Sequence, residues 1–325
     1  MTADSPAVTE AAQALARGEL IGLPTETVYG LAADALNAKA VAAIFSAKGR
    51  PADHPLIVHV SDAAQVAVFA SHVPVFAHTL MAAFWPGPLT LILPRLAGVA
   101  ESAAGGHPTI ALRCPSHPMA MSLLQAARNL GVKGVAAPSA NVFGRVSPTT
   151  AAHVREAFPQ LLVLDGGACD VGIESTIVDC SRASPVLLRP GMLSQSQLSG
   201  ACGVQVLSAL PPVADKPETS PAAPGSLASH YAPTARLYLM TAAQMAARLP
   251  AAGTSLAVWA RSALAIPSGV HGLSMPTDAA ACAHDLFAQL RAMDALGVQE
   301  IWVETPPLDE AWDGVRDRLQ RASTG

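Results

Sequence analysis

Residues 37–60, "NAKAVAAIFSAKGRPADHPLIVHV", place a helix and a strand one after the other. Asn37 is a good N-cap residue, a helical pattern follows it, and Gly49 is a typical helix end. The closing "LIVHV" is a short apolar run rich in branched residues, which predicts a strand. The stretch therefore predicts one α/β unit, with the cations Lys48 and Arg50 where the helix passes into the loop.

Short apolar runs and helical patterns keep alternating over the first two hundred residues, which is typical of an α/β domain with a large, mixed sheet. Strands are expected at residues 20–23, 56–60, 89–93, 109–113, 134–137, 161–164, 175–179 and 185–188. Helices are expected at residues 9–17, with Thr9 as N-cap, at 38–48 and at 117–131.

The composition changes at residues 211–225, "PPVADKPETSPAAPG", where five prolines stand among few residues that could be buried. Proline favours an extended, stiff backbone, so this stretch is predicted to be a linker. We expect a first domain over residues 1–207, the linker over 208–235 and a smaller α/β domain over 236–325. In the smaller domain, strands are expected at 235–240, 255–260 and 300–304, and helices at 242–249, 278–296 and 309–322.

Composition and charge restrict the kinds of function. The chain of 325 residues is 51% apolar, yet no uninterrupted run reaches the ~18 apolar residues of a membrane span, and its first ten residues lack the pattern of a secretory signal. The net charge is −4 and lysine and arginine do not cluster, which argues against stable binding of nucleic acid. The five cysteines are scattered without a CxxC pair. A cytoplasmic protein without a zinc site is therefore expected.

Several polar segments lie where predicted strands end, and in open α/β sheets ligands bind beyond the strand ends. "PTETVYGLAAD" (24–34) follows the first strand, and its threonines either bond to a local turn or face a ligand. Lys48 and Arg50 either complement a helix dipole or bind an anion, held by the stiff loop that Pro51 and Pro55 create.

Two basic side chains, His59 and Arg113, lie at or near the ends of predicted strands. His59 either packs within its strand or contacts a ligand. Arg113, which ends the apolar strand "TIALR", needs an anionic partner, either in a surface salt bridge or in a bound carboxylate.

The later segments are also ambiguous by themselves. In "APSANVFGRVSPT" (137–149), hydroxyl and amide groups either cap and turn the backbone or bind a ligand, and Ser147 is a candidate cap for a helix that starts near Thr149. The glycines of "GGACDVGIESTIVD" (166–179) would let backbone N–H groups approach a ligand, and Arg189 lies at a strand end before a Pro-Gly turn.

The common nucleotide and hydrolase motifs are missing from the sequence. It contains no GxxxxGK[ST] phosphate loop, no GxGxxG after a strand, no GxSxG and no HExxH. Pattern and spacing alone therefore predict a two-domain α/β protein with a crevice of cations and hydroxyls.

The ordered set "PTETVYGL", "KGRPADHPLIVHV", "PSAN", "STIVD", "RPG" and "HYAP" resembles the Sua5/YrdC/YciO family over essentially the whole chain, and the two-domain layout resembles its long form. The resemblance implies a YrdC-like first domain and a smaller, Rossmann-like second domain. It also implies L-threonylcarbamoyladenylate synthase activity, a nucleotidyl transfer that uses L-threonine, bicarbonate or CO2, and ATP with Mg²⁺ as cofactor. The products would be threonylcarbamoyl-AMP and pyrophosphate. Partner transferases would then pass the threonylcarbamoyl group to adenosine 37 of tRNA.

The resemblance also assigns residues. It implies that L-threonine is held by Thr27, His59, Arg113, Ala137 and Ser175. It implies catalytic roles for Lys48, Arg50, Ser139 and Asn141. It implies that ATP is contacted by Arg50, His54, Thr109, Ser139, Asn141, Ser147, Arg189 and Tyr231, with Mg²⁺ held by the ATP phosphates and not by protein side chains.

Two departures from the family pattern stand out. His54 occupies a position that is usually asparagine, so a contact to ATP there would depend on pH. The family's segment before "HYAP" usually carries a basic residue, whereas "APGSLASHYAP" (223–233) has Leu227-Ala228 in its middle.

Three alternatives compete with the synthase. A double-stranded RNA binder conflicts with the charge of −4. A larger carbamoylating enzyme would need acylphosphatase and zinc-finger segments that the sequence lacks. A YciO-like nucleotide- or RNA-binding protein without synthase activity would be shorter, so the second domain and "HYAP" favour the synthase.

Overall fold

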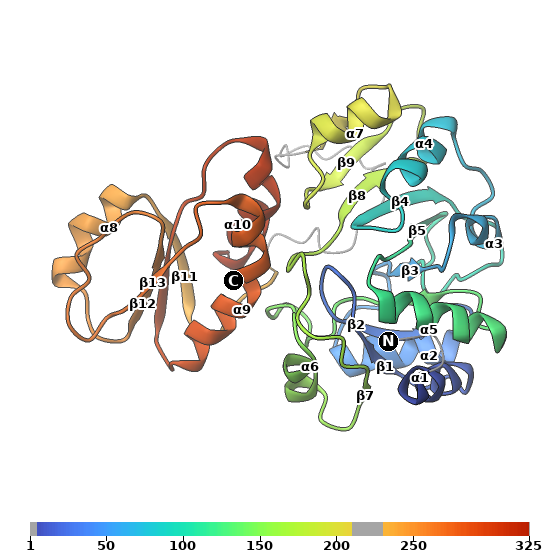
Figure 1. Cartoon of the computed structure of the whole chain (residues 1–325), viewed down its shortest axis with the longest axis horizontal. Coiled ribbons are helices and arrows are strands. Elements are labelled where there is room, and N and C mark those ends of the chain that lie inside the picture. The colour runs from blue at the N-terminus through green and yellow to red at the C-terminus, as the bar shows by residue number, and fades with distance from the viewer. Residues whose placement is uncertain (1–4, 210–229, 325) are drawn as a thin grey trace.

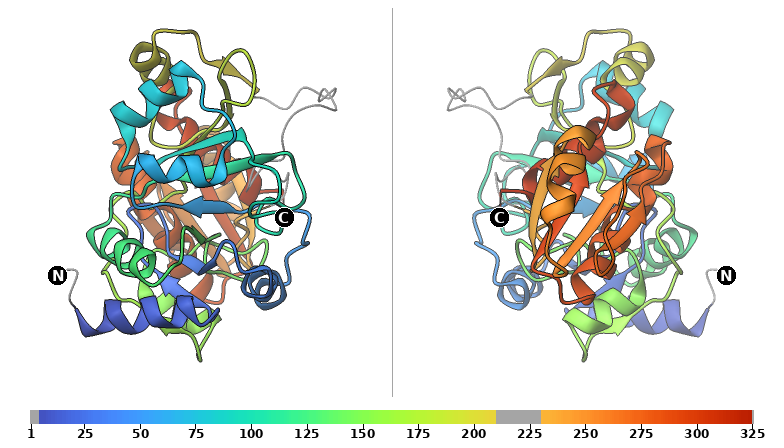
Figure 2. Two further views of the ribbon diagram at one scale, coloured as in Figure 1. Left: turned by 90° about the vertical axis from the view of Figure 1, so that its right-hand side faces the viewer. Right: turned by 90° about the vertical axis from the view of Figure 1, so that its left-hand side faces the viewer.

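The computed structural model describes residues 5–209 and 230–324, which form two α/β domains (Figure 1). The domains lie one behind the other in the two views of Figure 2. Each domain contains its own sheet, and the predicted α/β fold class with a large mixed sheet is confirmed.

The first domain is built on a ten-stranded mixed sheet. Its strands are β1 (Ile21–Leu23), β2 (Gly30–Asp34), β3 (Ile57–His59), β4 (Leu89–Pro94), β5 (Thr109–Arg113), β6 (Val135–Ala136), β7 (Leu162–Val163), β8 (Thr176–Asp179), β9 (Val186–Arg189) and β10 (Leu207–Ser208). They are ordered β10-β9-β8-β4-β5-β3-β6-β2-β1-β7. The helices are α1 (Pro6–Ala16), α2 (Ala38–Lys48), α3 (Val66–Phe69), α4 (Val75–Phe84), α5 (Pro118–Asn129), α6 (Ala151–Ala157) and α7 (Gln195–Cys202), with a 3-10 turn η1 (Ala63–Gln65).

The second domain has a four-stranded sheet in which every pairing is parallel. Its strands are β11 (Arg236–Met240), β12 (Leu256–Ala260), β13 (His271–Ser274) and β14 (Glu300–Glu304), in the order β11-β14-β12-β13. Its helices are α8 (Ala242–Arg248), α9 (Ala279–Ala295) and α10 (Asp313–Ala322), with 3-10 turns η2 (Leu249–Ala251) and η3 (Glu310–Trp312). Helices α9 and α10 lie on the side that faces the first domain, and α8 lies on the far side (Figure 1).

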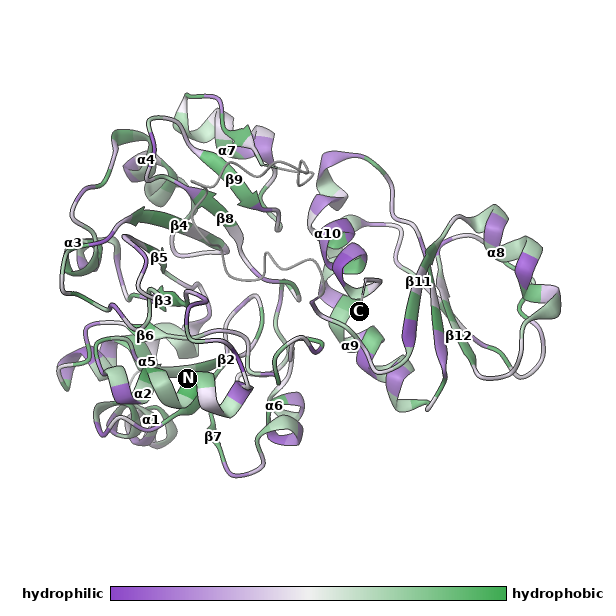
Figure 3. Ribbon diagram, turned by 180° about the vertical axis from the view of Figure 1, so that it is seen from behind, coloured by the Kyte–Doolittle hydropathy of each residue, from purple (hydrophilic) through white to green (hydrophobic). Residues whose placement is uncertain are grey.

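The large sheet has helices on both faces, but the helices do not share the same strands. Helices α2, α4 and α7 contribute to one core, and α1 and α5 contribute to a second core around β1 and β6. Apolar residues concentrate on β4, β8 and β9 (Figure 3). On the middle strands, side chains alternate between the faces: Val58 joins the α2 core, whereas Ile57 belongs to a small cluster on the opposite face. The face of the middle strands that carries Ile57, called the second face below, also borders a pocket.

The local signals of the opening stretch are confirmed. Asn37 caps α2, because its side chain accepts from the N–H groups of Lys39 and Ala40, and Gly49 ends the helix with φ +63°. The predicted start of α1 is wrong. The helix begins at Pro6 with Ser5 as N-cap, since proline fits the first helical position, and Thr9 lies inside it.

Some elements carry no clear signal in the sequence. Strand β2 lies in a stretch that has the pattern of a polar turn. Its sequence, "GLAAD", contains no β-branched or aromatic residue, so its pairing with β1 and β6 is what makes it a strand. Helices α4 and α7 and strand β13 were likewise not predicted.

The two domains meet through backbone as well as side chains. Gly172 has φ +81°, and a Cβ there would lie 2.4 Å from the carbonyl oxygen of Ala283 and 2.5 Å from Cα of His284, both in α9. The suggestion that Gly172 makes room for a ligand is therefore wrong, because the second domain fills that space. Nearby, His284 Nδ1 lies 3.1 Å from the Asp170 carbonyl, and Arg291 donates to the Val146 carbonyl at 2.6 Å.

The predicted linker over 208–235 falls largely on residues 210–229, which lie outside the described residues. Its last part, 230–235, leads into β11, and Tyr231 within it is buried. None of the helices in the described residues combines the length and the apolar character that crossing a membrane requires.

Replacing Gly172 with alanine is expected to lower the free energy of unfolding by about 2–4 kcal/mol, because the Cβ is strained at positive φ and overlaps α9. Gly167→Ala is the matched control. Gly167 has φ +83°, but no atom lies within 4 Å of the place that its Cβ would take, so only the backbone cost of about 1 kcal/mol is expected. Urea unfolding followed by circular dichroism measures both. Equal losses would show that the contact with α9 is not tight.

Candidate active site

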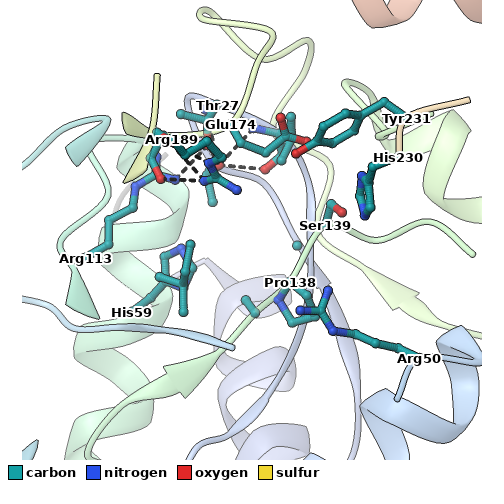
Figure 4. A pocket seen from close by; sticks show the side chains of 16 residues that line it. Thr27, Arg50, His59, Arg113, Pro138, Ser139, Glu174, Arg189, His230 and Tyr231 are labelled. Atoms are coloured by element: carbon teal, nitrogen blue, oxygen red, sulfur yellow. Dashed lines mark hydrogen bonds between the residues drawn. The ribbon is translucent and has the colours of Figure 1, made fainter. Parts of the chain in front are cut away.

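A pocket opens on the second face of the middle strands, and residues far apart in the sequence line it (Figure 4). Arg113 and His59 lie on one side, His230 and Tyr231 on the opposite side, and Glu174 and Arg189 between them. The lining consists of Thr25, Thr27, Val28, Gly30, Arg50, Ile57, His59, Arg113, Ala137, Pro138, Ser139, Glu174, Ser175, Arg189, His230 and Tyr231.

The alternation of side chains along β3 and β5 places His59 and Arg113 in the pocket. Strands β3 and β5 are parallel, and their register places His59 opposite Arg113. Val58 and Leu112, their neighbours in the chain, are buried in the α2 core. His59 and Arg113 therefore emerge together on the other face, at the same edge of the sheet.

Arg113 is held by an ion pair inside the protein. Its Nη2 lies 2.6 Å from Glu26 Oε1, and both side chains are buried. Its Nη1 donates to Thr27 Oγ1 at 2.8 Å. Burial alone would raise the pKa of Glu26, but Arg113 outweighs it and keeps that pKa below its ordinary value. Of the two alternatives for Arg113, the salt bridge exists but is not on the surface, and the guanidinium still lines the pocket.

His59 is electrically neutral in this environment. Burial, followed by the charge of Arg113, lowers the pKa of His59 to about 3. Its Nδ1 is buried and, within the described part of the chain, has no hydrogen-bond partner. A neutral imidazole with an unsatisfied buried nitrogen is suited to bind a polar ligand group.

The threonines of the first polar segment divide between the two predicted roles. Thr25 stabilises a local turn: its hydroxyl donates to the Val28 carbonyl at 2.6 Å and accepts from the N–H of Thr27 at 3.2 Å. Thr27 instead contacts Arg113 in the pocket.

Lys48 and Arg50, which stand two positions apart in the sequence, have different surroundings: Lys48 is structural and Arg50 lines the pocket. Lys48 is buried, and its Nζ donates to the carbonyls of Ser139 and Asn141 at 2.6 and 2.5 Å. Burial lowers its pKa well below the ordinary value. Arg50 lines the pocket, donates to the Pro55 carbonyl at 3.1 Å and lies over the ring of Phe143 at 5.8 Å.

The contacts of Lys48 also position Ser139 and Asn141 of the "PSAN" segment. Ser139 lines the pocket, next to Gly30 of β2. Asn141 does not line it: its Nδ2 donates to the Val142 and Arg145 carbonyls at 2.7 and 2.9 Å, and its Oδ1 is buried without a partner in the described chain.

Arg189 ends β9, and Ser175 directly precedes the neighbouring strand β8. Arg189 donates to the Ser175 carbonyl from Nε at 3.1 Å and from Nη2 at 2.9 Å. The Ser175 hydroxyl lies 2.7 Å from Thr90 Oγ1. This network fixes both lining residues.

Besides Asn141, three residues assigned to ATP lie away from the lining. Thr109 is at the opposite end of β5 from Arg113. His54 packs its ring 5.8 Å from that of Phe143. Ser147 donates to Glu174 Oε1 at 2.6 Å. The capping role for Ser147 is wrong, because Thr150 caps α6.

Sequence reasoning did not select Glu26, Glu174 or His230. Glu174 directly precedes Ser175, and His230 begins "HYAP", so both lay within quoted motifs. Burial lowers the pKa of His230 to about 3. The sequence does not show which residues contact these groups, because the partners of Glu26 and Glu174 are distant in the sequence.

A metal site made by the protein alone is not evident. Over residues 5–209 and 230–324, no group of three His, Cys, Asp or Glu side chains is placed to hold a metal ion.

Comparison with known proteins gives the same ordered match. The Sua5/YciO/YrdC family model, described as "Telomere recombination", matches residues 13–191. The model described as "Threonylcarbamoyl-AMP synthase, C-terminal domain" matches residues 193–324.

Individual relatives cover most of the chain. A threonylcarbamoyl-AMP synthase from Pyrococcus abyssi is 37% identical, over 96% of this chain and 93% of its own. One from Bacillus subtilis is 42% identical, over 73% of this chain and 67% of its own. The crystal structure of P. abyssi Sua5 complexed with L-threonine superposes with a TM-score of 0.87 at 35% identity, covering 98% of this chain and 94% of that one. The chain therefore belongs to the Sua5/YciO/YrdC family, in its two-domain form.

Proposed function

We propose that this chain is a threonylcarbamoyl-AMP synthase, a nucleotidyltransferase that converts L-threonine, bicarbonate or CO2, and ATP into threonylcarbamoyl-AMP and pyrophosphate. The observation that carries the proposal is the pocket, which joins a Thr27–His59–Arg113 corner to a second group made of Arg50, Ser139 and Arg189. Relatives named for this activity match over most of the chain, and one was solved with L-threonine.

The corner at the end of β3 and β5 has the chemistry to hold threonine. Arg113 offers a planar guanidinium for the carboxylate, and its ion pair with Glu26 already fixes its orientation. Neutral His59 can accept a hydrogen bond from the amino acid's nitrogen. Ala137 and Ser175, which also line the pocket, would complete this end.

The other group has the chemistry to hold ATP. Arg50 and Arg189 would neutralise phosphate oxygens, and Ser139 and Tyr231 offer hydroxyls in the same lining. Lys48 and Asn141 would act indirectly, because they hold the loop that carries Ser139. Contacts of His54, Thr109 and Ser147 to ATP remain predictions.

The proposed chemistry needs positioning and charge neutralisation more than a covalent nucleophile. The neutral amine nitrogen of threonine first bonds to the carbon of CO2 and releases a proton to water, which gives N-carboxythreonine, and an oxygen of its new carboxylate attacks the α-phosphorus of ATP. The bond between the α-phosphorus and the oxygen that links it to the β-phosphate breaks, and pyrophosphate leaves. Basic side chains that flank the phosphates stabilise the charge that builds up.

Mg²⁺ is proposed to enter with ATP. Glu174 is the one carboxylate among the described lining residues, and it is already bound by Arg318 and Ser147. The residues therefore offer no ready cage, and Mg²⁺ commonly binds through substrate phosphates.

The wider context follows from the same proposal. The product would be used by transferases that modify adenosine 37 of tRNA. The cytoplasmic location and the lack of stable nucleic-acid binding remain predictions of the sequence.

The first test is pyrophosphate release from ATP with L-threonine and bicarbonate added or withheld singly. Release that requires both, and that falls strongly with L-serine, is the expected result. Release without threonine, or no release from folded protein, would contradict the proposal.

Arg113→Lys is expected to raise the KM for L-threonine by about tenfold to a hundredfold, because lysine keeps a cation beside Glu26 but loses the guanidinium fork. The KM for ATP should change little. Arg128→Lys, in an exposed pair with Asp62, is the control. Pyrophosphate release gives both constants, and an unchanged KM for threonine would remove Arg113 from the threonine site.

The neutral state of His59 predicts a pH dependence of stability. The pKa of His59 falls from 6.5 to about 3 in the folded protein, so the unfolded chain takes up a proton that the folded chain excludes. Stability is complete above pH 6.5 and decreases below it. Between pH 7 and 5 the loss from His59 is about 2 kcal/mol. Urea unfolding at both pH values should show that His59→Asn loses about 2 kcal/mol less than the wild type. Equal losses would mean that His59 is protonated in the fold.

A further inference from the structure

A buried ion pair joins the second domain to the wall of the pocket. Arg318, in α10, is fully buried, and its Nε donates to Glu174 Oε2 at 2.8 Å. Glu174 belongs to the first domain and lines the pocket. The two residues are separated by 144 positions in the sequence, so only domain docking brings them together.

Arg318 also binds backbone on both sides of the pocket wall. Its Nη2 donates to the Glu174 carbonyl at 3.1 Å, and its Nη1 donates to the Pro190 carbonyl at 2.8 Å. The next residue after Glu174 is Ser175, and the residue before Pro190 is Arg189. One guanidinium of the second domain therefore fixes the chain beside two lining residues.

Glu174 is a buried carboxylate whose negative charge is neutralised by Arg318. Burial alone would raise the pKa of Glu174, but Arg318 above all, and then Arg189, keep it below the ordinary value. Its carboxylate is thus ionised in a pocket proposed to hold a triphosphate. An unneutralised negative charge there would repel the phosphates strongly, because the surroundings screen poorly.

Arg318 is itself firmly placed. It donates to Asp317 Oδ2 at 2.8 Å and lies over the ring of Tyr231 at 5.5 Å. Together with the bonds to Glu174 and Pro190, these contacts hold the guanidinium in one orientation toward Glu174.

We propose that Arg318 is a positioning residue for the proposed reaction: it neutralises and orients Glu174, and so allows the pocket to bind the triphosphate of ATP. The inference rests on the proposed function and assigns the second domain a part in nucleotide binding. It predicts a defect in ATP affinity, separate from threonine affinity, when Arg318 is lost.

The test compares Arg318→Gln, Glu174→Gln and the double variant. Arg318→Gln should raise the KM for ATP by about tenfold and leave the KM for threonine within about twofold. Adding Glu174→Gln removes the unneutralised charge, so the double variant should return to within about threefold of the wild-type KM for ATP. Loss of packing alone would not produce this rescue.

Arg316→Gln is the matched control. Arg316 lies on the same helix and pairs with Asp313 within the second domain, so the variant removes the same charge without touching the pocket wall. Its constants should match the wild type. Circular dichroism and thermal unfolding establish that each variant is folded.

If Arg318→Gln does not fold, the Glu174→Gln background still decides the question. Once Glu174 is neutral, removing Arg318 should change the KM for ATP by no more than about threefold. A tenfold rise there would mean that Arg318 attracts ATP directly, which would overturn the inference. An unchanged KM for ATP in folded Arg318→Gln would overturn it as well.

Binding of α,β-methylene-ATP, measured by calorimetry, separates this inference from the proposed function. If the wild type releases no pyrophosphate but the variants show the predicted order of affinities, the synthase proposal fails and the role of Arg318 in nucleotide binding stands. If the wild type is an active synthase and the affinities do not differ, only the inference fails.

Discussion

The pocket depends on taking ionisable groups out of water and holding them with fixed partners. Lys48 donates to the carbonyls of Ser139 and Asn141. Arg113 is bound by Glu26, and Glu174 is bound by Arg318. Burying a charge without a partner is costly, so these pairs hold loops from distant parts of the chain in one arrangement. The groups that face a ligand are oriented by the same pairs that keep the fold intact.

The sheet determines which face carries the chemistry. In β3 and β5, alternate residues enter the α2 core and the others lie on the opposite face, where His59 and Arg113 stand together at the ends of their strands. The alternation explains why a histidine interrupts the apolar run "LIVHV". Val58 is buried in the α2 core, and its neighbour His59 points to the opposite face, which lines the pocket.

Local patterns in the sequence predicted the alternation of strands and helices and the caps at Asn37 and Gly49, whereas it was the resemblance to the family that named lining residues such as His59 and Arg113. Local signals suffice where a turn or cap acts within a few residues. They fail for β2, whose neighbours in the sheet make it a strand, and for Glu174, whose partner comes from the other domain. Lys48 shows the same limit: its motif indicated importance, but its contacts with backbone carbonyls are a property of the fold.

The contact between Gly172 and α9 has a consequence for how such a chain can diverge. At most interfaces a new side chain is accommodated when its neighbours change rotamer, but here both surfaces are main chain. A larger residue at 172 requires α9 to shift, and α9 carries Arg291, which holds the Val146 carbonyl. Substitutions on the two sides are therefore not independent: a change at 172 has to be matched by a change in the position of α9.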